Sequence, residues 1–192
     1  MMIPSLIHPT AILHPNVMIG EGARVEPYVV LGSVTGEPLE IGSDAVIRSG
    51  TRIYGGVRIG DGLRTGHNAL IRGAVVIGDD FHIGSYSSVE GTVWIDDRVK
   101  IQGRCEVADS FIHADARLWV QTIVCDNNRP PDGEKEPPTI GAGAHLYARV
   151  LVMPGANIGA GAVIAANAMV KGNIPPGALL TKSGKIIEQV SS

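Results

Sequence analysis

Aliphatic residues recur at every sixth position through the middle of the chain. From residue 41 to residue 107 one phase is aliphatic at every step except Thr65. Its members are Ile41, Ile47, Ile53, Ile59, Thr65, Ile71, Ile77, Ile83, Val89, Ile95, Ile101 and Val107. A period of six is even, so it suits strands, whose side chains alternate between two faces, and it suits no helix. The pattern therefore predicts a repeat of short strands.

A second column lies two residues before the first and is mostly small or apolar. Its members are Leu39, Ala45, Thr51, Val57, Leu63, Ala69, Val75, Phe81, Ser87, Val93, Val99 and Cys105. Both columns fall on one face of the strands, so both should point inward. Glycine often follows the first column, as in Ile59-Gly60 and Ile77-Gly78, which indicates a bend after each strand. Three such units, about eighteen residues, close one triangular coil of a parallel β-helix.

The hexads extend almost from end to end, with two interruptions. They begin at Ile7 and continue to Val170. Turn-forming residues interrupt them at 32–38, and a polar segment with two Pro-Pro pairs breaks them completely from residue 125. We expect the second segment, 125–139, to be a long protruding loop that carries function, although a solvent excursion would have the same sequence. The repeat predicts one domain over 1–177 and a C-terminal tail over 178–192.

Three segments carry a family resemblance: Ile7-His8-Pro9-Thr10-Ala11, residues 158–164 and residues 169–177. They resemble the hexapeptide-repeat acyltransferases, and are closest in pattern to nucleotide-sugar N-acetyltransferases. The resemblance implies an all-β fold, a left-handed parallel β-helix of about nine coils forming a triangular prism. The hand comes from the resemblance alone, because the general preference for right-handed crossovers predicts the opposite. Residues 180–185 depart from the family pattern, which weakens any assignment of coenzyme A contacts to the tail.

The resemblance also implies an activity. It implies an acyl-CoA-dependent acyltransferase, most simply one that transfers acetyl from acetyl-CoA to the amino group of a nucleotide-linked amino sugar. In the family, trimers hold acyl-CoA in the groove between neighbouring prisms and the acceptor beneath a loop, so a homotrimer is expected. A flat-walled prism has no cleft of its own, and two walls with a loop supply the missing concavity.

Two histidines are the candidate bases. Acyl transfer needs a neutral nucleophile, a donor for the oxyanion and enforced proximity, and histidine best meets the first need near neutral pH. Gly66-His67-Asn68 resembles a Gly-His-Asn segment of the family, which implies that Asn68 helps to hold the acceptor amine and that His67 acts as base or orients the acceptor. His113, near the loop in sequence, is the second candidate. An exposed histidine at a prism corner is the alternative interpretation of each.

Further candidates come from the loop and the last coils. The loop opens with polar residues that resemble a sugar-binding loop of the family, although turn chemistry explains the same residue types. These residues are Asp126, Asn127 and Asn128. Small residues near the end would leave the backbone open to the pantetheine arm of the cofactor, and Lys171 would meet a phosphate unless it is simply solvated. The small residues are Gly159, Ala160, Gly161 and Ala162.

Composition restricts the partners. The net charge is −3 and no basic run occurs, which argues against nucleic acid and anionic membranes as partners. No leader pattern or membrane-spanning apolar run is present, so a cytoplasmic protein is expected. Cys105 and Cys125 are too few for a disulfide or metal framework, and no metal is expected.

Two other functions remain open. A metal-dependent hydratase resembling the γ-class carbonic anhydrases would share the prism, but its pair of histidines five residues apart is missing here. A non-catalytic scaffold is the third possibility, against which the long loop and the Gly-His-Asn segment argue mildly.

Overall fold

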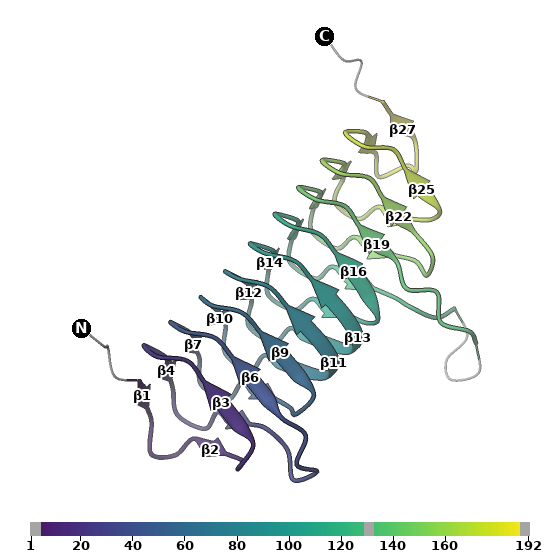
Figure 1. Ribbon diagram of the computed structural model, residues 1–192. Coiled ribbons are helices and arrows are strands. Elements are labelled where there is room, and N and C mark those ends of the chain that lie inside the picture. The colour runs from purple at the N-terminus through teal and green to yellow at the C-terminus, as the bar shows by residue number, and fades with distance from the viewer. Residues whose placement is uncertain (1–4, 129–132, 189–192) are drawn as a thin grey trace.

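The computed structural model describes residues 5–128 and 133–188, which form a single stack of triangular coils (Figure 1). Strands of successive coils pair in parallel and in register along three walls. The predicted all-β repeat is confirmed, and the described part of the chain contains no helix long and apolar enough to cross a membrane.

The walls are named here by their order along each coil. The first wall contains β1 (Leu6–Ile7), β4 (Arg24–Val25), β7 (Val46–Ile47), β10 (Arg64–Thr65), β12 (His82–Ile83), β14 (Lys100–Ile101), β17 (Arg117–Leu118), β20 (His145–Leu146), β23 (Val163–Ile164) and β26 (Leu179–Leu180). The second contains β2 (Ile12–Leu13), β5 (Val30–Leu31), β8 (Arg52–Ile53), the starts of β11 (Leu70–Ile77) and β13 (Ser88–Ile95), β15 (Glu106–Val107), β18 (Ile123–Val124), β21 (Leu151–Val152) and β24 (Met169–Val170). The third contains β3 (Val17–Ile19), β6 (Leu39–Ile41), β9 (Val57–Ile59), the ends of β11 and β13, β16 (Ser110–Ile112), β19 (Thr139–Ile140), β22 (Asn157–Ile158) and β25 (Asn173–Ile174).

The corners take their names from the walls that they join. The first corner joins the first and second walls, the second corner joins the second and third, and the third corner leads back to the first wall of the next coil. A final strand, β27 (Ile186–Ile187), pairs antiparallel with β26. Parallel pairing continues to Leu180, three residues beyond the boundary expected at Gly177.

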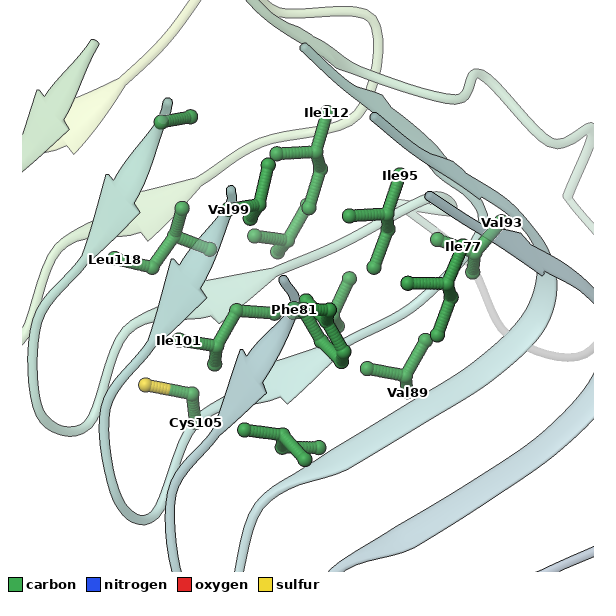
Figure 2. Packing of buried hydrophobic residues seen from close by; sticks show 14 of the residues in the cluster. Ile77, Phe81, Val89, Val93, Ile95, Val99, Ile101, Cys105, Ile112 and Leu118 are labelled. Carbon is green, nitrogen blue, oxygen red and sulfur yellow. The ribbon is translucent and has the colours of Figure 1, made fainter. Parts of the chain in front are cut away.

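Both predicted columns fill the interior of the prism. Every member of the two columns is buried, and Figure 2 shows Phe81, Val89, Val99 and their neighbours pointing toward one another inside the coils. Thr65, the polar exception, is 6% exposed, and its Oγ1 accepts the Arg48 backbone N–H at 2.8 Å and lies 3.3 Å from Thr51 Oγ1. The exception is therefore satisfied inside the wall and marks no ligand by itself.

The structure corrects the expectation that a bend follows every strand. β11 and β13 are eight residues long and run around the second corner without interruption. The cause is Gly73 and Gly91, whose φ values of 106° and 96° turn the chain within the strand. The predicted slip after Val107 is confirmed: Ile95 pairs with Ile112, a step of seventeen residues.

The long loop leaves the prism at the second corner, between β18 and β19. Figure 1 shows it projecting from the stack, as the sequence predicted. Residues 129–132 of the predicted loop lie outside the described residues.

Candidate functional site

The first residues of the loop, Cys125 to Asn127, line a cavity of about 550 Å³ on the second wall. The outward residues Ala108 and Ile123 give it an apolar side, whereas the side chains of Val107 and Val124 are buried in the core. Glu90, Glu106 and Asp126 place three carboxylates in its lining. Asn127 lines it as well, whereas Asn128 is exposed and lies outside the lining. The cavity thus combines an apolar surface with negative charge, which suits a ligand that carries an amine.

Lys135 holds the far side of the loop to the prism. Its Nζ lies 2.6 Å from Asp109 Oδ2 and 3.3 Å from Asp126 Oδ2. Asp109 is buried, and its other carboxylate oxygen accepts the Thr92 backbone N–H at 2.6 Å. The hydrogen bond to Asp109 raises the pKa of Lys135, so the ammonium stays charged at neutral pH. A backbone bond from Glu136 N–H to the Asp126 carbonyl, 2.7 Å long, also closes the loop.

Glu106 differs from the other two carboxylates of the cavity. Glu90 pairs with Arg72 of the preceding coil, and Asp126 pairs with Lys135. Within residues 5–128 and 133–188, Glu106 forms no ion pair. Since it stands outward on β15 beside the apolar floor, it is the carboxylate best able to meet a ligand.

Cys125 lines the same cavity but is a poor nucleophile. Partial burial raises the pKa of its thiol, and the charges of Asp126 and Glu106 raise it further. The thiolate is the reactive form, so Cys125 stays largely unreactive near neutral pH. Cys105 is buried as predicted, and burial raises its pKa to about 11.

His67 and Asn68 lie at the first corner, away from the cavity. His67 is exposed, and its backbone N–H donates to Ser85 Oγ at 2.9 Å. Asn68 has a φ of 55°, and Gly50 and Tyr86 at the same corner of the adjacent coils also have positive φ. Asn is one of the residues that tolerate this conformation, so the turn accounts for its presence.

His113 lies at the third corner, where a carboxylate orients it. Its Nδ1 is 2.9 Å from Asp96 Oδ2, and Asp96 Oδ1 accepts the Trp94 Nε1–H at 3.2 Å. An imidazole held by a carboxylate is an arrangement typical of a general base. Asp96 and Trp94 were not predicted from the sequence, although Asp96 precedes His113 by one seventeen-residue coil.

The small residues of the last coils have structural explanations. Gly159 lies so close to the backbone of Pro176 in the next coil that a Cβ would overlap it. Gly161 has a φ of 65°, and Ala160 precedes it in the turn. Ala162 is buried in the core, so only its backbone could meet a cofactor. Lys171 is exposed at the second corner, on a different edge of the prism from these residues.

The sequence prediction missed a column of basic residues on the first wall. Arg64, His82, Lys100 and Arg117 pair in register on successive coils and point outward. Partial desolvation lowers the pKa of His82, and the charges of Lys100 and Arg64 lower it further, against the opposite effect of Asp80. The eighteen-residue spacing of Arg64, His82 and Lys100, one coil each, could have revealed the column.

No group of three or more His, Cys, Asp or Glu side chains within the described ranges is arranged to hold a metal ion.

Comparisons with known proteins identify solved structures that share the fold of this chain. No family model and no curated protein matches the chain. Among solved structures, the UDP-N-acetylglucosamine acyltransferase from Bacteroides fragilis is similar, with a TM-score of 0.78 and 19% identity over 96% of this chain and 74% of that one. The UDP-N-acetylglucosamine O-acyltransferase from Moraxella catarrhalis has a TM-score of 0.57 and 17% identity, over 90% and 70% of the two chains.

The fold is a left-handed parallel β-helix. The hand, which the hexad spacing could not give, is thus the one that the family resemblance implied. The similar Campylobacter jejuni UDP-N-acetylglucosamine acyltransferase, with a TM-score of 0.57 and 13% identity over 90% of this chain and 70% of that one, has the same architecture. At these identities the left-handed β-helix is the shared feature, and activity has to be argued from the residues.

Proposed function

We propose that this left-handed β-helix is an acyltransferase that moves an acyl group, most simply acetyl, from acyl-CoA to the amino group of a nucleotide-linked sugar. The observation that carries the proposal is the loop cavity, in which carboxylates stand beside an apolar floor. Glu106, which forms no ion pair within residues 5–128 and 133–188, can attract an ammonium group and accept its proton. Fold similarity to proteins named as UDP-N-acetylglucosamine acyltransferases supports acyl transfer to a nucleotide sugar by analogy.

The proposed reaction is direct transfer without an acyl-enzyme. The neutral amine attacks the thioester carbonyl carbon, and a carbon–nitrogen bond forms while the carbon–sulfur bond breaks. The proton released from nitrogen passes to the carboxylate of Glu106 and then to the coenzyme A thiolate, so free thiol and amide are the products. Cys125 stays protonated beside Asp126 and Glu106, which is consistent with a mechanism that lacks a cysteine nucleophile.

His113 is a second candidate for the base, because Asp96 orients its imidazole at 2.9 Å. It lies at the third corner, while the loop cavity is on the second wall. For both to act on one substrate they would have to come from two chains. The proposed homotrimer would permit this, since a neighbouring prism would also close the open side of the cavity.

A thiol-release screen tests the function. The purified protein is incubated with acetyl-CoA and a panel of nucleotide-linked amino sugars, each matched with the parent sugar that carries a hydroxyl in place of the amine. Release of coenzyme A with an amino sugar and not with its hydroxyl partner is the expected result. Release with the hydroxyl sugars alone would overturn the choice of acceptor, and no release with any of them would leave the scaffold interpretation in its place.

Size-exclusion chromatography with light scattering tests the trimer separately. A mass near three times 20.1 kDa is expected. A monomer that retains full activity would rule out a base contributed by a second chain.

A further inference from the structure

The basic column of the first wall is unusually regular. Arg64, His82, Lys100 and Arg117 occupy β10, β12, β14 and β17, which pair in register. Figure 1 shows β10, β12 and β14 on successive coils. At the strand spacing of about 4.8 Å, the four side chains extend over about 14 Å. His145 continues the column on the next coil.

This column lacks the acidic partners that Arg58, Arg72 and Arg98 have. Arg58 pairs with Glu40, Arg72 with Glu90 and Arg98 with Asp115, each across one coil. Within the described part of the chain, no carboxylate forms an ion pair with any member of the column. Asp80 and Asp115 are the acids that interact with it over longer distances.

Stacking like charges directly opposite one another is unfavourable in a sheet. Desolvation is the largest cause of the lowered pKa of His82, and the charges of Lys100 and Arg64 lower it further. Elsewhere on the prism, residues one coil apart carry opposite charges and pair, as Arg58 does with Glu40 and Arg72 with Glu90. A wall that only faces solvent therefore has no need of stacked basic residues. An anionic ligand would relieve the repulsion and gain from all of the charges at once.

The surface beside the column is hollowed and ends in aromatic rings. A depression of about 220 Å³ follows Arg64, His82 and Lys100 past Gly66 and Gly84, which have no side chains to fill it. A smaller one of about 90 Å³ lies between Lys100, Arg117 and Trp119. Trp119 stacks on Tyr147 with ring centroids 5.7 Å apart, and both rings are partly exposed. An exposed aromatic face of this kind suits a planar nucleobase.

We propose that the first wall binds a nucleoside diphosphate group, with its phosphates on Arg64, Lys100 and Arg117 and its base against Trp119. The proposal rests on the proposed function to this extent: both nucleotide-linked sugars and acyl-CoA contain this group. The loop cavity supplies the acceptor's amine site on another face, so the first wall adds the site for a substrate's nucleotide end. The first wall lies opposite the second corner, from which the loop projects, so the loop does not reach over the basic column.

Tryptophan fluorescence measures this binding without turnover. The chain has two tryptophans, Trp94 and Trp119, so Trp94→Phe leaves the emission of Trp119 alone. The probes are UDP, GDP and coenzyme A, each titrated into the full-length protein. Saturable quenching in Trp94→Phe that is lost in Trp119→Phe is expected for at least one probe. Quenching by UDP or GDP assigns the wall to the acceptor nucleotide, and quenching by coenzyme A assigns it to the donor.

Charge removal provides the decisive control. Lys100→Gln with Arg117→Gln should weaken binding about 100-fold, or about tenfold for each charge-assisted hydrogen bond that is removed. Arg52→Gln with Arg58→Gln removes two positive charges from the second and third walls of one coil and should change Kd less than twofold. Absence of quenching by all three probes, or equal weakening in the two double variants, would overturn the proposal.

The two proposals fail in different ways. Nucleotide binding at the first wall without thiol release from any acceptor would contradict the proposed function alone. Turnover by the unaltered protein with no nucleotide-dependent change in Trp119 would contradict the first-wall site alone.

Discussion

The first wall and the second wall use one backbone geometry to carry different arrangements of charge: the second wall has both signs, and the first has a column of basic residues. In both, side chains one coil apart stand in register at the same strand spacing. On the second wall and its loop, Arg72 meets Glu90 and Lys135 meets Asp109. Glu106 and Arg52 form no ion pair there within the described residues. On the first wall, basic side chains stand directly above one another on successive coils. In a parallel in-register stack, the outward residue that each coil contributes therefore sets the charge of the column.

This difference matters because a prism provides no other source of specificity. Its walls are flat and its interior is full, so ligands are distinguished by outward columns and by the one loop. The second wall offers an apolar floor and carboxylates, which suit an amine. The first wall offers cations and an aromatic pair, which suit phosphates and a base. The two faces are adjacent walls of one chain, and they meet at the first corner.

The largest expected effect comes from removing the carboxylate of Glu106 on the second wall. Glu106→Gln keeps the size of the side chain but cannot accept a proton. We expect kcat to fall about 100-fold or more, the usual contribution of a general base, while the melting temperature stays nearly unchanged. Steady-state thiol release with the acceptor found in the screen measures it.

Matched variants decide what a loss in Glu106→Gln means. Glu40→Gln changes the same residue type on the third wall, where Glu40 pairs with Arg58, and should retain activity. A loss in His113→Gln with normal activity in Glu106→Gln would assign the base to the third corner instead. In that case Asp96→Asn should also reduce kcat, because Asp96 orients the imidazole.

A smaller effect is expected from releasing the loop. Lys135→Met removes the cation that joins buried Asp109 to Asp126, so Asp126 in the cavity lining is no longer held in place. We expect KM for the acceptor to rise about tenfold with little change in KM for acyl-CoA, and stability to fall by about 1 kcal/mol because the lysine is largely solvated. Kinetics and chemical denaturation measure the two. Lys182→Met, on the exposed tail, is the control, and an equal rise in its KM would show that the loop contact is irrelevant.

The fold was predictable because the hexad period exposes it directly. Every sixth residue identifies the inside, and the breaks in phase identify the loop and the slip before Ile112. Two features of the fold could not be predicted from the period. Gly73 and Gly91 carry strands around a corner, which requires their φ values, and the sequence cannot supply these. The hand was available only through the family resemblance, because the period is the same for either hand.

The candidate site was harder to predict than the fold, because a single histidine in the sequence does not indicate which side chains surround it. His67 resembled a family motif but lies at an exposed corner, and His113 gained its partner from the preceding coil. Asp126 and Asn127 open the only long break in the hexads, and both line the cavity, while their role in binding substrate stays a prediction. The basic column was missed since its members are seventeen or eighteen residues apart, one coil each. Only a search for outward residues at the coil period would have found it.

The smallest expected effect concerns His82, where the pH dependence of stability tests the repulsion within the first wall. Its pKa is lowered in the folded protein by desolvation and by Lys100 and Arg64, so the unfolded chain binds more protons. The linked stability is thus fully present above the unfolded pKa of about 6.5 and is lost as pH falls below it.

Lys100→Gln removes one of the two cations beside His82. The pKa of His82 should therefore rise toward its ordinary value, and the loss of folding stability between pH 7.5 and pH 5.5 should become smaller. Titration of the His82 ring proton by NMR measures the first change, and denaturant unfolding at the two pH values measures the second. Lys182→Gln removes a lysine far from His82 and should change neither. An unaltered His82 titration in Lys100→Gln would show that the column is not electrostatically coupled, and the contrast between the walls would then reduce to their outward residue types.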